Sequence, residues 1–357
     1  MPRIKAVVLG SGGLVAQRLL QRLAQHPWFE THAVAGSPGR VGQPLNDLVW
    51  RLPEPRPILP DLKVIALDDA ATIERCRAEG VGVVFSALPT EVARRVEPMW
   101  ARAGMPVLSN AAAYRRVEGV PLVVPEVNPT DLKGLTETNS PLACATNCTL
   151  LPLLLPLAAL DEAFGLLSWT MRSEQALSGG GYGLIDEVDR TGECPTDIPG
   201  EAEKTEAEFR HLLNWEGEAT LSCRRVRRTD GHHVLVEASF ERELELSSVT
   251  HALSAWSERV TPRHLPSAPD NAIMLVDAVD PIRHVNANGS HVTTEGDPSV
   301  DLKLGMAVVV GNMEIDHHRV RFEALSHNTL RGAAGGVVYL AELAVDMGLL
   351  RPTRAQG

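Results

Sequence analysis

Residues 4–27, IKAVVLGSGGLVAQRLLQRLAQHP, decide the fold predicted for this chain. They run from a short apolar segment through the glycine turn GSGG into a segment whose apolar residues recur at helical spacing. A strand, a glycine turn and a helix in this order are typical of the first unit of a dinucleotide-binding sheet. Gly10 and Gly13 would let a pyrophosphate approach the free N–H groups at the helix N-terminus. On its own the turn is a weak signal, because a plain tight turn has the same composition.

The same alternation continues through the first 150 residues. Residues 31–36, 81–89 and 105–110 are short apolar runs that predict strands, and residues 91–104 predict a helix. Alternating strands and helices favour a parallel sheet covered by helices. The pattern then changes, and strand-like runs predict a mixed or antiparallel sheet at residues 166–177, 232–241, 306–315 and 317–326.

The length of 357 residues favours two domains. We predict a first domain over residues 1–147 and a second over residues 148–330. Residues 335–348, GGVVYLAELAVDMG, predict a closing helix, and we expect the segment 331–357 to return to the first domain. The predicted fold class is therefore α/β, with an N-terminal Rossmann-like, doubly wound parallel sheet and an α+β domain built on a mixed sheet.

Composition excludes several classes of function. Lys and Arg total 34 against 45 Asp and Glu, a formal charge of −11, which argues against nucleic-acid and anionic-membrane binders. The five cysteines are irregularly spaced without a CxxC pair, so we expect a reduced, cytoplasmic protein without disulfides or a structural zinc. We find neither a secretory signal nor an apolar stretch of about 18–20 residues, and therefore expect no membrane association.

The end of the second predicted strand bears on the choice of nucleotide. The sequence there is AGSPGR, residues 35–40, which lacks the Asp or Glu typical of NAD sites. Ser37 and Arg40 are suited to hold a 2′-phosphate, which favours NADP over NAD. The alternative is an ordinary solvated turn.

Among the five cysteines, Cys148 has the context of a reactive thiol. In ATNCTLLP, Asn147 is a candidate N-cap and Cys148 a residue of the first helical turn, where the dipole would lower the thiol pKa. Pro152 fits the first turn, whereas we expect Pro156 to kink or end the helix. A buried, inert cysteine is the alternative.

Residues 223–233, CRRVRRTDGHH, supply the partners that a thiolate needs. His232 can act as acid and base near neutral pH, and Arg225 can bind a carboxylate or phosphate through two hydrogen bonds. For Arg227 and Arg228 we favour an exposed basic loop. The pair His317-His318 has no third ligand nearby, so we predict no metal site.

The ordered motifs resemble the aspartate-β-semialdehyde dehydrogenase family, in the form common in archaea and fungi, over about residues 4–350. The matching segments are residues 10–18, 85–93, 109–112, 125–129, 147–149, 175–182, 200–204, 225–232 and 327–335. Ala16 replaces a usual glycine, Thr146 a usual proline, and RVRRTDGH stands where the family has RVPVxxGH. The added arginines leave the identity of the substrate open.

The resemblance implies an NADP-dependent, reversible conversion of L-aspartate 4-semialdehyde and phosphate into L-4-aspartyl phosphate through a thioester on Cys148. This reaction serves lysine, threonine and methionine biosynthesis. The resemblance implies that His232 and Gln175 are catalytic with Cys148, and that substrate or phosphate contacts Arg225, Glu201, Lys204, Arg115 and Asn147. The residues implied at the cofactor are Gly10, Ser11, Gly12, Gly13, Leu14, Val15, Ser37, Arg40, Ser86, Leu88, Ser178, Gly179 and Asn328. It further implies that the first domain binds NADP, and that the second is a catalytic and dimerisation domain of a homodimer or homotetramer.

Other interpretations stay open. Malonyl-coenzyme A reductase shares the thioester cysteine and the two-domain plan, and extra arginines would suit a bulkier anion. N-acetylglutamyl-phosphate reductase usually has a GCY context, which Asn147-Cys148-Thr149 does not match. A catalytically silent paralogue is a third alternative. Glu201 and Lys204 also lie in a charged helical stretch where ion pairs are common, and Arg115 has Arg116 beside it.

Overall fold

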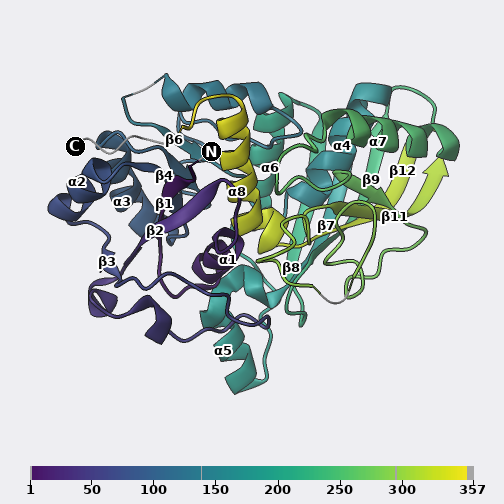
Figure 1. The fold of residues 1–357 in the computed structure, drawn as a ribbon. Helices are drawn as coiled ribbons and strands as arrows, with labels where there is room; N and C mark the ends of the chain where they lie inside the picture. The colour runs from purple at the N-terminus through teal and green to yellow at the C-terminus, as the bar shows by residue number, and fades with distance from the viewer. Residues whose placement is uncertain (1, 138, 294–295, 352–357) are drawn as a thin grey trace.

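Two six-stranded sheets organise the computed structural model, which describes residues 2–137, 139–293 and 296–351 (Figure 1). The strands of the first sheet pair in parallel, in the order β3-β2-β1-β4-β5-β6. This is the strand order of a doubly wound nucleotide-binding fold, so the predicted α/β class is confirmed. The strands are β1 (Ile4–Leu9), β2 (Phe29–Gly36), β3 (Ile65–Ala66), β4 (Val81–Ser86), β5 (Val107–Ser109) and β6 (Leu142–Cys144).

Helices cover both faces of this sheet. They are α1 (Leu14–Leu23), α2 (Ala70–Ala78), α3 (Thr90–Arg102) and α8 (Gly335–Asp346), with short helical turns η2 (Leu45–Asp47) and η3 (Pro129–Thr136) in the connections. The C-terminal α8 packs against α1, β4 and β5, far from it in sequence (Figure 1). The helix ends at Asp346, whereas residues 352–357 of the predicted segment 331–357 lie outside the described ranges. The division at residue 147 stays a prediction.

The second sheet is mixed, in the order β10-β11-β12-β9-β7-β8. Its outer pairs β10–β11 and β7–β8 are parallel, and its inner pairs are antiparallel. The strands are β7 (Leu166–Gln175), β8 (Glu218–Arg225), β9 (His232–Phe240), β10 (Ile273–Leu275), β11 (Val308–Asp316) and β12 (Arg319–Ser326). This confirms the mixed sheet expected after residue 150.

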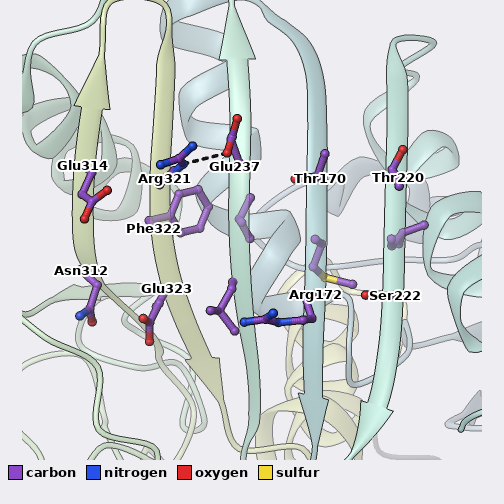
Figure 2. A pocket seen from close by; sticks show the side chains of 14 residues that line it. Thr170, Arg172, Thr220, Ser222, Glu237, Asn312, Glu314, Arg321, Phe322 and Glu323 are labelled. Atoms are coloured by element: carbon purple, nitrogen blue, oxygen red, sulfur yellow. Dashed lines mark hydrogen bonds and ion pairs between the residues drawn. The ribbon is translucent and has the colours of Figure 1, made fainter.

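Three helices, α4 (Leu151–Phe164), α6 (Glu201–Leu213) and α7 (Leu246–Val260), pack on one face of the mixed sheet. The opposite face carries polar and charged side chains from alternate positions of the strands (Figure 2). There Arg321 Nε donates to Glu237 across the β12–β9 pair at 2.8 Å. This open face is therefore polar and carries charges of both signs.

Helix α4 corrects one expectation. We expected Pro156 to kink or end the helix, and the helix does not end there but continues to Phe164. All ten residues from Leu151 to Leu160 are buried. Each buried leucine contributes roughly 1.5–3 kcal/mol, so packing against the sheet outweighs the roughly 3 kcal/mol that an internal proline costs.

Candidate active site

Cys148 lies in a capped turn between the two sheets. The side-chain Oδ1 of Asn147 accepts hydrogen bonds from the N–H groups of Thr149 and Leu150, both at 2.9 Å. The helix itself begins only at Leu151, so Cys148 precedes the first helical turn rather than belonging to it, which corrects our prediction. The cysteine is half-buried.

One face of α6 holds this turn in place. Glu201, Thr205 and Glu208 follow one another at helical spacing. Glu201 accepts from the Thr149 hydroxyl at 2.8 Å, and Thr205 accepts from the Asn147 side-chain amide at 3.3 Å. Glu208 accepts from the Asn147 main-chain N–H at 2.8 Å and from the Thr146 hydroxyl at 2.6 Å. The turn that carries the thiol is therefore fixed from outside by three side chains of one helix.

The ionisation of Cys148 differs from the expectation drawn from its position. Burial first and the carboxylate of Glu201 second raise the pKa of the thiol, which comes to about 12. Arg115 and Arg225 partly lower the pKa again, because their positive charges stabilise the thiolate. The predicted lowering is thus wrong for the free chain, in which Cys148 is a protonated thiol at neutral pH.

His232 opens strand β9 and is fully buried. The main-chain N–H of Ala176 donates to its Nδ1 at 3.2 Å, so the neutral ring carries its proton on Nε2. That Nε2 is buried and has no hydrogen-bond partner among the described residues. Burial, and then the charges of Arg225 and Arg228, hold the pKa of His232 well below its ordinary value. The ring is therefore a neutral imidazole with an unused N–H.

The pairing of β7 with β8 and β9 brings the other predicted residues to this ring. Gln175 ends β7 opposite Arg225, the last residue of β8, and both are buried. Arg225 Nη1 donates to the Ala176 carbonyl at 2.8 Å. A Cβ on Gly179 would lie 2.9 Å from Arg225 Nη1 and 3.0 Å from His232 Cε1. Gly179 belongs to the turn η4 (Leu177–Gly180), so the glycine leaves room for both side chains.

The segment after β12 closes the site on its other side. A Cβ on Gly332 would lie 2.5 Å from the Cβ of Cys148, so a side chain there would collide with the cysteine. Gly332 belongs to the π-helical turn η5 (Leu330–Ala334), which the buried ion pair of Arg331 with Glu126, at 2.6 Å, anchors. A π-helical turn of this kind often occurs at functional sites.

Asn328, just ahead of η5, joins two of the predicted segments. Its Nδ2 donates to Ser178 Oγ at 2.7 Å, and its Oδ1 accepts from the Gly231 N–H at 2.8 Å. Asn328 and Ser178, both expected at the cofactor, are therefore in contact and lie beside His232.

The predicted phosphate and carboxylate ligands are placed unevenly. Lys204 is half-buried, and its ammonium lies 3.4 Å from the carboxylate of Glu201. Arg115 points inward, whereas Arg116 is exposed, which decides between them. Arg115 donates to Glu208 at 3.2 Å and to the Asn110 carbonyl at 2.6 Å. Both Nη groups of Arg115 thus donate to other residues of the protein. Its effect on Cys148 is the electrostatic one of a nearby positive charge.

Arg227 and Arg228 are not two free surface cations. Arg227 is exposed but donates to the carbonyl of Gly192, which follows helix α5 (Gly181–Thr191). Arg228 is half-buried and donates to the carbonyls of Glu174 and Gly231. The expectation of an exposed loop is therefore wrong for Arg228, because main-chain acceptors draw its guanidinium inward.

The glycine turn after β1 forms the second half of the site. Gly10 has φ +115°, in the region that glycine favours, and a Cβ there would approach the Ala87 carbonyl at 3.3 Å. A Cβ on Gly12 would lie 2.6 Å from Cζ of Arg40, the last residue of the turn η1 (Pro38–Arg40). The guanidinium of Arg40 therefore lies directly over the turn, whereas Ser37 is exposed.

The other residues expected at the cofactor lie around this turn. Ser11 packs against the end of β2, because a Cβ on Gly36 would lie 2.5 Å from its hydroxyl. Leu14 and Val15 begin α1 at the end of the turn, Ser86 ends β4, and Leu88 follows it. These positions lie at or beyond the carboxyl ends of parallel strands, where nucleotides bind in this architecture.

Sequence reasoning missed the residues that hold the site from behind. Thr205 and Glu208 carry a recoverable signal, since with Glu201 they share one face of a helix. The pair formed by Arg18 Nη1 with Glu54, at 2.7 Å, carries none, because the two residues are distant in sequence. Arg18 Nε also donates to Thr329 at 3.2 Å. This hydrogen bond connects α1, the helix after the glycine turn, to the residue next to Asn328.

The described residues contain neither a metal cluster nor a membrane-spanning helix. Within the described ranges, no cluster of three or more His, Cys, Asp or Glu side chains is arranged to hold a metal. Among the helices of those same ranges, none combines the length and the apolar character that crossing a bilayer requires.

The chain is similar to known proteins along nearly its whole length. Residues 5–135 match the family described as semialdehyde dehydrogenase, NAD binding domain. An aspartate-semialdehyde dehydrogenase of Archaeoglobus fulgidus is 35% identical over 96% of this chain and 98% of that relative. A malonyl CoA reductase (NADP) of Metallosphaera sedula is 29% identical over 97% of this chain and 98% of its own length.

A solved structure has the same fold. The crystal structure of aspartate semialdehyde dehydrogenase with NADP from Candida albicans superimposes with a TM-score of 0.78 at 28% identity. The match covers 98% of this chain and 100% of that one. Both sheets, and the site between them, therefore fall within the aligned region.

Proposed function

The chain belongs to the aspartate-semialdehyde dehydrogenase family, and we propose that it converts L-aspartate 4-semialdehyde and phosphate reversibly into L-4-aspartyl phosphate with NADP. As a member of this family it is an oxidoreductase. One observation carries the proposal. Cys148, His232, Gln175 and Arg225 converge from four separate segments on one site, in a chain 35% identical to a relative of that name.

In this proposal Cys148 is the nucleophile. The thiol loses its proton as its sulfur forms a bond to the aldehyde carbonyl carbon, and the carbonyl oxygen takes up a proton. The carbon would then give up a hydride, for which NADP is the acceptor, and the oxygen a proton to solvent, so that the acyl group is held as a thioester. Phosphate then attacks the thioester carbonyl, the carbon–sulfur bond breaks, the sulfur leaves as thiolate and takes up a proton again, and the acyl phosphate is the product. In the reverse direction the same bonds form and break in the opposite order.

His232 serves the carbonyl oxygen. Its Nε2–H is buried and unused, so it is suited to donate a hydrogen bond to the negative oxygen of the tetrahedral adduct. The low pKa of the ring keeps it neutral at pH 7. Taking a proton at Nε2 requires that the ring proton first move to Nδ1, where the Ala176 N–H now donates. Donation at Nε2 is therefore the role that the free chain supports.

Charged side chains around the sulfur would bind the anionic groups of the substrate. Arg225 is buried next to Gly179 and is suited to bind the substrate carboxylate. Lys204 offers positive charge to phosphate, and Arg115 adds charge from behind. Glu201 would contact the substrate amino group. Gln175 and Asn147 would orient the thioacyl group, Asn147 through the turn that it caps.

The glycine turn fits NADP. Because Gly12 has no Cβ, the guanidinium of Arg40 lies directly against the turn, where it is suited to bind a 2′-phosphate. No carboxylate follows β2, which suits a 2′-phosphate. We propose that the residues from Gly10 to Val15, with Ser37, Arg40, Ser86, Leu88, Ser178, Gly179 and Asn328, hold this cofactor. NADP would supply the hydride acceptor at Cys148.

The arginine contacts favour this substrate over malonyl-coenzyme A. A bulkier anion would need extra cations at the entrance of the site. Arg227 and Arg228 instead donate to the main-chain carbonyls of Gly192, Glu174 and Gly231. The 29% identity to a malonyl CoA reductase is also lower than the 35% to the aspartate-semialdehyde dehydrogenase.

We further propose a cytoplasmic homodimer that acts in lysine, threonine and methionine biosynthesis, with residues 148–330 as the catalytic and dimerisation domain. The open face of the mixed sheet supports dimerisation, because it carries both charges side by side, as in Arg321 and Glu237 (Figure 2). Two copies related by a two-fold axis can pair such charges reciprocally. Sedimentation of the purified chain tests this, and a monomer at micromolar concentration would contradict it.

The enzymatic proposal is tested by following NADP reduction with aspartate semialdehyde as phosphate is added or withheld. We expect turnover that requires phosphate and is abolished by Cys148→Ser. Activity with malonyl-coenzyme A alone would support the reductase alternative. If the chain turns over neither substrate, or if Cys148→Ser retains its activity, the proposal is wrong.

A further inference from the structure

Arg228 stands where the related motif has an apolar residue, and its side chain makes four contacts with the protein. Its Nε and Nη2 both donate to the Gly231 carbonyl, at 3.1 and 2.8 Å. The same Nη2 donates to the Glu174 carbonyl at 3.1 Å, and Nη1 lies 4.0 Å from the Glu174 carboxylate. The guanidinium thus joins the end of β7 to the residue directly before His232.

The two carbonyls belong to residues that adjoin the candidate catalytic groups. Glu174 precedes Gln175, and Gly231 precedes His232. Gly231 has φ +91°, so the chain turns sharply as it enters β9. The Gly231 carbonyl belongs to the peptide bond that joins Gly231 to His232. The two hydrogen bonds from Arg228 to this carbonyl, here called the clamp, therefore fix the orientation of the main chain that carries the His232 ring.

Main-chain hydrogen bonds reinforce the same connection. The N–H of Leu177 donates to the Arg228 carbonyl at 2.8 Å, and the N–H of Ser178 donates to the Thr229 carbonyl at 3.1 Å. These hydrogen bonds join the loop of residues 226–231 to the turn that contains Gly179. Gly179 lies beside the His232 ring, since a Cβ on this glycine would lie 3.0 Å from His232 Cε1. Arg228 adds the side-chain hydrogen bonds to Gly231, the residue next to His232.

The far face of the sheet supplies a counter-charge. Glu174 pairs there with Arg224, and its carboxylate lies 3.7 Å from His233 Nδ1. His233 Nε2 in turn lies 2.8 Å from Glu323. Glu174 thus compensates Arg228 without approaching His232, whose ring points to the opposite face.

We propose that Arg228 is a positioning residue, which holds the Gly231 peptide so that the Nε2–H of His232 faces the sulfur site. This inference rests on the proposed function for its kinetic consequence. The charged and titratable groups that face His232 are Arg225 from β8, Arg228 from the loop and His327 after β12. Both arginines disfavour the protonated ring, so Arg228 also helps keep it neutral.

The test compares Arg228→Met with Arg227→Met. The side chain of Arg227 is exposed and, within the described residues, donates only to the carbonyl of Gly192 in another loop. A displaced donor lowers kcat, and we expect a loss of about 10- to 100-fold for Arg228→Met with KM nearly unchanged. Arg227→Met should keep kcat within about twofold. Arg228→Lys, which retains the charge and one carbonyl contact, should recover part of the loss.

A second readout does not depend on turnover. The titration of His232 is followed by NMR of carbon-labelled histidine and assigned with His232→Gln. We expect its midpoint to move to higher pH in Arg228→Met, because one positive charge near the ring is gone, and to stay in place in Arg228→Lys. If the wild-type chain lacks the proposed activity, this titration still reports on Arg228.

Three outcomes would overturn the inference. The first is kcat within twofold of wild type in Arg228→Met. The second is a rise in KM with kcat preserved, which would make Arg228 a substrate contact. The third is an equal loss in both methionine variants with an unmoved His232 titration, which would show a merely structural loop. If Arg228→Met does not fold, Arg228→Lys carries the test, and a kcat equal to that of the wild type in Arg228→Lys would contradict the clamp.

Discussion

The carboxylate of Glu208 accepts a hydrogen bond at 2.8 Å from the main-chain N–H of Asn147, 61 residues earlier in the chain. The same group binds the hydroxyl of Thr146 and the guanidinium of Arg115. All four residues are buried, so Glu208 is the common acceptor of the turn that presents Cys148. The packing of α6 thereby fixes the position of Cys148.

Replacing this acceptor should damage both stability and activity. In Glu208→Gln the amide offers one acceptor where three donors converge, and Arg115 loses its buried partner. We expect the free energy of unfolding to fall by about 3 kcal/mol, as measured by urea denaturation. Glu206→Gln is the matched control, because Glu206 is half-buried and pairs only with Arg210 along the helix. Its loss should be about 0.3–0.5 kcal/mol, and an equal effect of both variants would contradict the role of Glu208.

The ionisation of Cys148 should respond to Glu201. Because the Glu201 carboxylate raises the pKa of the thiol, its neutralisation lowers that pKa and increases the thiolate fraction at any pH below it. In Glu201→Gln we expect alkylation of Cys148 by iodoacetamide at pH 8 to accelerate about three- to tenfold. Glutamine can still accept from Thr149, so the turn should stay in place.

The matched control for this measurement is Glu203→Gln, since Glu203 is exposed on the same helix. It should leave the alkylation rate unchanged. Conversely, Arg225→Met removes a charge that lowers the thiol pKa and should slow the reaction. A rate in Glu201→Gln that is equal to or below that of the wild type would mean that the carboxylate does not control the thiol.

Arg40 should govern the preference for NADP. Its guanidinium lies over Gly12, and a charge-assisted hydrogen bond contributes about 1.5–3 kcal/mol. We expect Arg40→Met to raise the Kd for NADP about 10- to 100-fold and to change the Kd for NAD little, as measured by fluorescence titration. Arg75→Met, on an exposed position of α2, is the control. Equal weakening for both nucleotides would place Arg40 away from the 2′-phosphate.

Local patterns were sufficient for much of this molecule. The run from Ile4 to Leu23 encodes β1, the glycine turn and α1 within its own sequence, because strand, turn and helix each depend on near neighbours. Four strands of the mixed sheet, β7, β9, β11 and β12, were also predicted from their apolar and β-branched residues, whereas β8 and β10 were missed. Cys148 and His232 were predicted as catalytic because few residue types act as a nucleophile or as an acid and base near neutral pH, and this assignment stays a prediction.

Other features depend on contacts that no local pattern contains. The path of α4 through Pro156 follows from burial against a sheet formed later in the chain. The raised pKa of Cys148 follows from desolvation by distant segments, so a rule for helix N-termini gave the wrong sign. Arg228 turns inward because the Glu174 carbonyl lies beside it, 54 residues earlier in sequence.

Gly332 should be intolerant of any side chain. A Cβ there would lie 2.5 Å from the Cβ and 2.8 Å from the Cα of Cys148, well inside the roughly 3.5–4.0 Å of normal carbon contact. Since the Cα belongs to the main chain, the cysteine turn itself must move, and a small displacement of a nucleophile is costly. We expect Gly332→Ala to lower kcat by about 100-fold while KM for NADP changes little. Gly183→Ala is the control, because the space around Gly183 in α5 is open among the described residues. The melting temperature and the rate of Cys148 alkylation, measured on both variants, separate a displaced thiol from an unfolded chain. A kcat near that of the wild type in a folded Gly332→Ala would show that this close approach is not needed to place the sulfur.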